Sequence, residues 1–315
     1  MKPTLFPLRR LACGLLPLFL TQCATTPPQT VRNLSSEELA KLQALHDPWS
    51  GRESELSAKI PDKRLEALAD MAIENRNFKS SLVNYLQVLK DHPERYDLHY
   101  KVGVIFLMSG NLEAAKKELA LVLVHKPQML RAHEALGLVF LHEKQYPHAI
   151  DEFNYVLAQD PRRAIAYHLL GVTYLEANRY ESAIRELRKA TALDSHRLSS
   201  WIALSQVYLK QKNYSQAATT LKRAQTLAPE NHKINRMLGQ ALAGEKLYPQ
   251  ALTAFLKAGD EAQAYNNIGV YYFMDGSYEE AAKCFQRAIE LRPTFYLEAK
   301  NNLQRALEKL QESRQ

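Results

Sequence analysis

The stretch LRAHEALGLVFLHEKQYPHAIDEFNYVLAQDP, residues 130–161, decides the fold of the chain. It contains a small residue, Gly137, which is followed nine positions later by Tyr146 and twelve positions later by Ala149. Apolar residues recur at helical spacing on both sides of a polar turn. The stretch therefore predicts two antiparallel helices, in which the small residues let the two backbones approach closely.

The same pattern returns along the chain with a period of 34 residues. The small position is occupied in turn by Ala69, Gly103, Gly137, Gly171, Ser205, Gly239 and, after a step of 30, Gly269. Seven units in one register make chance agreement negligible. Because no single unit can bury its apolar stripe alone, the sequence predicts a stacked repeat array over residues 62–295.

The period, the order of small and large positions and the proline that closes most units resemble the tetratricopeptide repeat. The resemblance implies an all-α solenoid of about seven helix-turn-helix units, wound as a right-handed superhelix. The expected units are residues 62–95, 96–129, 130–163, 164–197, 198–231, 232–261 and 262–295. Residues 296–315 are amphipathic and are expected to form a C-terminal capping helix, with a partner-binding segment as the alternative.

The first 22 residues have the features of an export signal. MKPTLFPLRR is basic, and the apolar LACGLLPLFL that follows is too short to span a bilayer. Leu20-Thr-Gln-Cys23 resembles a bacterial lipobox, although Gln22 stands where that pattern usually has a small residue. The resemblance implies cleavage after residues 1–22 and lipidation of Cys23, which would anchor the chain to the membrane. A simple cleaved signal peptide and an uncleaved anchor are the alternatives.

The segment between the lipobox and the repeats has two parts. Residues 23–34 are rich in Thr and Pro and are expected to form a flexible tether. Residues 35–61 are expected to contain a short helix and a linker, because Ser35 and Glu38 form a capping box at the start of SSEELAKLQALH. If Cys23 carries lipid, the one cysteine left in the mature chain is Cys284, which is expected to be a small buried residue.

The sequence contains no arrangement of residues typical of an enzyme. His142-Glu143 is not followed by a second histidine at metal-binding spacing, and no glycine-rich phosphate loop or Gly-x-Ser-x-Gly motif occurs. We therefore expect no catalytic residues, no metal and no cofactor. The formal charge of +7 includes three basic residues of the signal segment, and the remainder is too diffuse to indicate nucleic-acid binding.

We therefore expect the function to be binding of other proteins, and the resemblance implies where the binding surface lies. In this repeat family the first helix of each unit lines a concave groove. Residues at fixed register around the small position give the candidate groove: Tyr100, Val104, Leu107, Glu134, Leu138, Leu141, His168, Val172, Leu175, Ile202, Gln206, Leu209, Arg236, Gln240, Asn266, Asn267, Val270 and Phe273. Its apolar middle suits a helical or extended peptide segment, and its basic, amide-rich end, which includes Lys233, suits a carboxylate. The alternative is that several of these residues pack against the next unit.

The combination of a lipobox and an uninterrupted array resembles the TadD-type tight-adherence (Flp) pilus-assembly lipoproteins and the type IV pilus pilotins of Gram-negative bacteria. With Ala24 after the cysteine, the resemblance implies an outer-membrane lipoprotein that faces the periplasm. It also implies a scaffold that helps to assemble a pilus or secretion machine, with a secretin or pilus-assembly component as partner. An adaptor or regulator of cell-wall or outer-membrane biogenesis enzymes is the main alternative. An enzyme on a repeat scaffold is more remote, because the array leaves no room for a catalytic domain.

Overall fold

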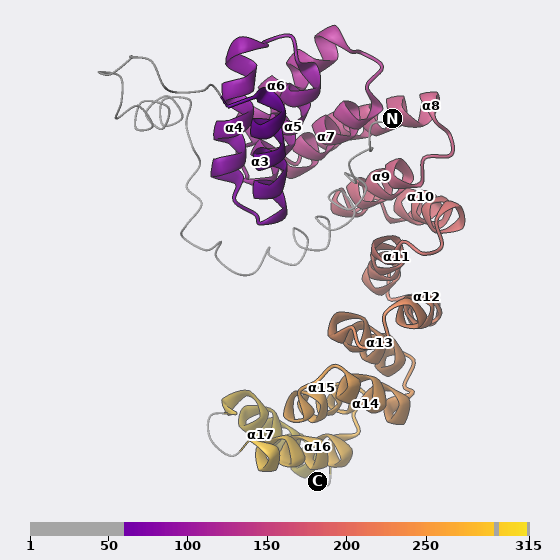
Figure 1. Ribbon diagram of the computed structural model, residues 1–315. Coiled ribbons are helices and arrows are strands. Elements are labelled where there is room, and N and C mark those ends of the chain that lie inside the picture. The colour runs from indigo at the N-terminus through magenta and orange to yellow at the C-terminus, as the bar shows by residue number, and fades with distance from the viewer. Residues whose placement is uncertain (1–59, 293–295, 314–315) are drawn as a thin grey trace. The chain divides into compact units, whose positions relative to one another are not determined.

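The computed structural model describes residues 60–292 and 296–313, and all regular structure within these ranges is α-helical. The all-α fold expected from the sequence is thereby confirmed. The helices follow one another along the chain as antiparallel pairs (Figure 1). The expected signal segment, Cys23, the tether and the helix over residues 35–46 lie outside the described residues.

The helices form seven pairs, in which each first helix begins at, or one residue before, the first residue of an expected unit and each second helix ends four residues before the last. The pairs are α3 Asp62–Glu74 with α4 Phe78–Asp91, α5 Tyr96–Met108 with α6 Leu112–His125, α7 Leu130–His142 with α8 Tyr146–Gln159, α9 Ala164–Glu176 with α10 Tyr180–Leu193, α11 Leu198–Lys210 with α12 Tyr214–Leu227, α13 His232–Gly244 with α14 Tyr248–Lys257, and α15 Glu261–Met274 with α16 Tyr278–Leu291. A last helix, α17, spans Leu297–Glu312.

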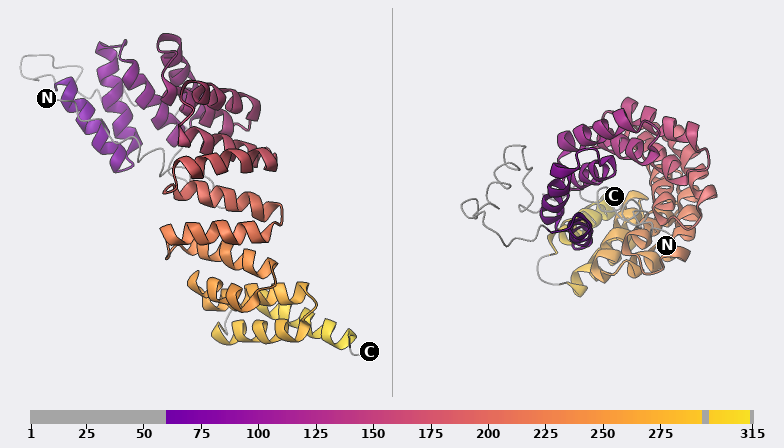
Figure 2. Two further views of the ribbon diagram at one scale, coloured as in Figure 1. Left: turned by 90° about the vertical axis from the view of Figure 1, so that its right-hand side faces the viewer. Right: turned by 45° about the horizontal axis from the view of Figure 1, so that its top comes forward.

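The chain forms two compact units, one up to Thr173 and one from Tyr174 onward, so that the division falls within α9. In the first unit, α4 contacts α3 and α5, and α6 contacts α5 and α7, so each of these second helices contacts its own first helix and the first helix of the next pair. The same order holds in the second unit from α11 to α16, whose helices lie in successive layers (Figure 2). Neighbouring pairs within each unit are therefore in contact, as a stack of repeats requires.

At Gly103, Gly137, Gly239 and Gly269, the small position on the first helix faces a large buried side chain on the second helix of the same pair. A Cβ atom built on Gly137 would lie 2.5 Å from Cε1 of Phe153, and one built on Gly239 would lie 2.5 Å from Cδ1 of Phe255. Both rings are buried. The absence of a side chain at Gly137 and Gly239 is thus what lets the rings fill the layer between the helices.

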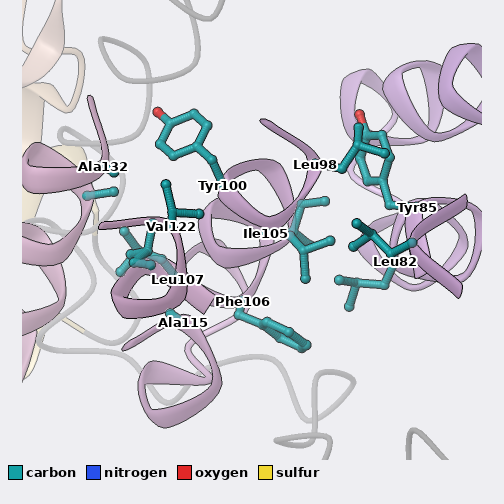
Figure 3. Packing of buried hydrophobic residues seen from close by; sticks show 14 of the residues in the cluster. Leu82, Tyr85, Leu98, Tyr100, Ile105, Phe106, Leu107, Ala115, Val122 and Ala132 are labelled. Atoms are coloured by element: carbon teal, nitrogen blue, oxygen red, sulfur yellow. The ribbon is translucent and has the colours of Figure 1, made fainter. Parts of the chain in front are cut away.

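The core of the first unit shows how neighbouring pairs share one layer of side chains (Figure 3). Leu98 and Ile105 of α5 lie toward Leu82 and Tyr85 of α4, which belongs to the preceding pair. Leu107, also on α5, lies on the side of α6. A first helix therefore buries one stripe against its own partner and another against the pair before it.

A polar contact also recurs with the repeat. The residue four positions before the small position places a side-chain nitrogen near the carbonyl oxygen that lies six residues earlier in the chain, at the turn between pairs. These nitrogen-to-oxygen contacts are His99 to Pro93 at 3.1 Å, His133 to Pro127 at 2.9 Å, Trp201 to Ser195 at 2.9 Å and Asn235 to Pro229 at 2.9 Å. They satisfy turn carbonyls that no helix pairs, so these side chains fix the turn between successive units.

The last pair is covered by α17. Ala299 and Ala306 of α17 are buried, and the helix packs mainly on α16. Asn266 of α15 donates to Glu298 at 3.2 Å and accepts from Asn302 at 3.1 Å, so polar contacts also fix α17. No helix among the described residues is long and apolar enough to cross a membrane.

We predict that Gly137→Val lowers the free energy of unfolding by about 1–3 kcal/mol, because the new side chain must displace the Phe153 ring from a filled core. The measurement is the midpoint of denaturant unfolding. Ala120→Val, at an exposed position of α6, is the control and should cost less than about 1 kcal/mol. Equal losses in the two variants would contradict the packing described for Gly137.

Candidate protein-binding face

The candidate site is a face of the first helices, which we call the first-helix face. It consists of the residues three before, one after and four after the small position, such as Glu134, Leu138 and Leu141 on α7, and of Lys233, which lies three residues before Arg236 on α13. This spacing of three to four residues places them along one stripe of the helix. All candidate residues expected from the sequence, except Asn267, lie on this stripe, and burial divides the candidates into two groups.

The first group is buried and offers no surface to a partner. It consists of Tyr100, Leu107, His168, Val172 and Asn266. Burial raises the pKa of Tyr100 to about 12, and the amide of Asn266 is already engaged by α17. For these five residues the expectation of an open groove position is wrong, and the alternative of packing within the array describes them.

The second group keeps part of its surface accessible. In the first unit it comprises Val104, Leu138 and Leu141, and in the second unit it comprises Leu175, Ile202, Gln206, Leu209, Arg236, Gln240, Asn267, Val270 and Phe273. Phe273 is already in contact with α17, because the guanidinium of Arg305 lies 5.3 Å from its ring centroid. The role of the others in binding stays a prediction.

Ion pairs between successive first helices were not anticipated. Arg163 donates from Nε and Nη2 to the two carboxylate oxygens of Glu134, at 2.5 and 2.8 Å. Arg95 makes the same bidentate contact with Glu66, at 3.0 and 3.2 Å. Both arginines occupy the same register, directly before the next first helix, so the repeat period could have revealed the pairing. These contacts use Glu134 internally and make it a linking residue of the first unit.

In the second unit, the two cations of α13 have no such partner among the described residues. Lys233 is half-buried and Arg236 is exposed, and both lie on α13. Burial and the nearby Arg236 lower the pKa of Lys233. Within residues 60–292 and 296–313, no carboxylate forms an ion pair with either side chain. Together with the exposed amide of Gln240, α13 therefore presents donors that an anionic group could satisfy.

The described part of the chain holds no group of three or more His, Cys, Asp or Glu side chains placed to bind a metal ion. Cys284 is half-buried on α16, where burial and the charge of Glu280 raise the pKa of its thiol to about 11. A thiol in this environment is a poor nucleophile, because it is the thiolate that reacts.

Comparison with protein families supports the repeat assignment directly. Tetratricopeptide-repeat families match residues 66–124, 109–164 and 202–260 in one case and residues 262–295 in another, which together span more than half of the chain. The chain belongs to the tetratricopeptide-repeat family. Residues 142–224 are also similar to the family described as anaphase-promoting complex, cyclosome, subunit 3. A comparison with curated protein sequences finds no match.

Solved structures show the same fold. PilF of Pseudomonas aeruginosa is 25% identical over 69% of this chain and 98% of its own, with a TM-score of 0.52. A tetratricopeptide-repeat protein from Parabacteroides merdae is 15% identical over 78% of this chain and 98% of its own, with a TM-score of 0.54. The C-terminal part of a repeat protein from Cytophaga hutchinsonii is 16% identical over 75% of this chain and 98% of its own, with a TM-score of 0.59. The last two likenesses concern the fold alone.

We predict that Cys284 in the folded protein is alkylated at pH 8 about a hundredfold more slowly than in the denatured chain. A pKa near 11 leaves about a hundredfold fewer thiolates than an ordinary cysteine has at this pH. The rate should rise about tenfold per pH unit between pH 8 and pH 10 in the folded protein. Mass spectrometry of the Cys284 peptide gives the rate, and equal rates before and after denaturation would contradict the burial of the thiol.

Proposed function

We propose that this tetratricopeptide-repeat array is a lipid-anchored periplasmic scaffold that binds a protein segment along its first-helix face and assists the assembly of a pilus or secretion machine at the outer membrane. The observation that carries the binding proposal is the accessibility of side chains on the first helices of the second unit. Its first helices keep apolar and cationic side chains accessible, and the cations of α13 have no carboxylate partner among the described residues.

The chemistry of this face indicates the kind of segment it would take. Ile202 and Leu209 lie on one stripe of α11 and are half-buried, so each could lose its remaining exposed area to an apolar side chain of a partner. Lys233 and Arg236 on α13 would pair with an acidic side chain or a terminal carboxylate. The proposed ligand is therefore an amphipathic peptide segment with an acidic end.

The likeness to PilF supports the pilus part of the proposal. PilF is a pilus-related tetratricopeptide-repeat protein, and this chain covers nearly its whole length. The lipobox-like segment before Cys23 supports the membrane anchor. An anchored array would hold its partner at the bilayer surface, where it raises the local concentration of a component that must insert or assemble there.

We predict that the double change Lys233→Glu with Arg236→Glu reduces capture of the partner at least tenfold, because it replaces two donors with two charges that repel an acidic segment. The measurement is quantitative co-purification from detergent extracts of cells. The matched control is Lys222→Glu with Arg223→Glu on α12, where both side chains are exposed on a second helix. Equal capture by the two variants would count against the first-helix face as the binding site.

The identity of the captured protein tests the pathway. A secretin or another pilus component would support assembly of a pilus or secretion machine. A peptidoglycan synthase would instead favour the role of an adaptor for cell-wall enzymes.

We predict that Cys23→Ser releases the protein from the membrane fraction into the periplasmic extract, because the lipid is the proposed anchor. The measurement is fractionation followed by immunoblotting. Ser36→Ala, which leaves the lipobox-like segment intact, should stay in the membrane fraction. Membrane retention of the Cys23→Ser protein would overturn the anchor without affecting the binding proposal.

A further inference from the structure

The first helix of the array, α3, exposes two large apolar residues on a face that is mostly buried on the later first helices. Leu68 and Met71 are 40% and 57% exposed. They lie one residue before and two residues after the small position Ala69. Large exposed apolar side chains on one face of a helix indicate a contact with a segment that is not among the described residues.

The later units show what this face is built to contact. The residues equivalent to Leu68 are at most 8% exposed: Val102, Leu136, Leu204, Leu238 and Ile268. Among the residues equivalent to Met71, Ile105, Val139, Val207 and Ala241 are at most 1% exposed, and Tyr271 is half-buried. Ile105 lies toward Leu82 of the preceding pair (Figure 3). The equivalent face of α3 is therefore shaped to receive a preceding helix, and the described residues contain none before it.

The other end of the array is covered by a segment of the same chain. Helix α17 packs on α16 and supplies the buried residues Ala299 and Ala306. Repeat arrays need such covers at both ends, because a terminal unit otherwise leaves an apolar face in water. The cover for α3 is thus to be sought in the chain that precedes it.

We propose that residues 35–46 form a helix that packs on the Leu68–Met71 face of α3. Leu39, Leu42 and Leu45 recur at a spacing of three residues and would lie on one side of that helix, and Ala40 and Ala44 would lie on the other. The segment begins with the capping box of Ser35 and Glu38 and with acidic residues, and the α3 face carries the exposed cation Arg64. The leucines of the segment therefore complement the apolar residues of the α3 face, and its acidic residues complement Arg64.

The length of chain between the segment and α3 permits this contact. Residues 47–59 can span about 45 Å when extended, at roughly 3.3–3.6 Å per residue. Helix α3 has 13 residues and is about 20 Å long at 1.5 Å per residue. The segment can therefore fold back along the whole of α3 in either direction.

The contact would also set how far the array stands from the membrane, a consequence that rests on the proposed anchor at Cys23. With residues 35–46 packed on α3, the free tether is residues 24–34, which reach at most about 40 Å. Without the contact, residues 24–59 could reach about 120 Å. The segment would thus hold the array close to the bilayer surface.

The test is hydrogen–deuterium exchange of the full chain, extracted in detergent. We expect the double change Leu39→Glu with Leu42→Glu to speed exchange of the α3 amides at least tenfold. The control, Ala40→Glu with Ala44→Glu, adds the same charge on the opposite side of the helix and should leave α3 unchanged. Met71→Glu should in turn speed exchange within residues 35–46.

Two results would overturn the proposal. One is an α3 exchange rate that is the same in the native chain and in both double variants. The other is α3 protection that falls on dilution and is insensitive to the Leu39 and Leu42 changes, which would assign the face to a second copy of the chain. None of these outcomes depends on partner capture, so the proposal can fail while the proposed function holds.

Discussion

The close contact between a small residue on the first helix and a large side chain on the second is the constraint on which the rest of the structure depends. At Gly137 and Gly239 the backbone lies so near the rings of Phe153 and Phe255 that a Cβ atom could not be added without moving them. This contact fixes the distance between the helices of a pair. Because it recurs at Gly103, Gly137, Gly239 and Gly269, it gives these pairs a similar shape, and pairs of similar shape can stack.

Stacking in turn decides which side chains are available for binding. A first helix buries one stripe against the second helix of its own pair and another against the preceding pair. The first-helix face is a third stripe, which remains for other contacts. In the first unit, ion pairs such as Arg163 with Glu134 use part of that face to link successive pairs. In the second unit, Arg236 and Gln240 are exposed and Lys233 is half-buried beside Arg236, and no carboxylate of the described residues pairs with these cations.

The repeat architecture could be predicted from the sequence almost to the residue, because the period and the breakers at the turns are local signals. The accessibility of individual face residues could not, because it depends on neighbouring units. Asn266 looks like a groove residue in its own helix, but it is buried by contacts with Glu298 and Asn302, which lie 32 and 36 residues further along. His168 and Val172 are likewise buried, although their register matches that of accessible residues in other units. The bidentate arginine pairs, in contrast, follow the period and could have been found.

The most direct test of the account is site-specific photo-crosslinking in living cells, with a photoreactive amino acid placed at one position at a time. The positions are Leu209 and Arg236 on first helices, and Leu227 and Arg223 on a second helix, all of which keep accessible surface. If the partner binds along the first-helix face, the two first-helix positions give a discrete crosslinked protein and the second-helix positions give none. Crosslinks that form only from Leu227 or Arg223 would contradict binding along the first-helix face.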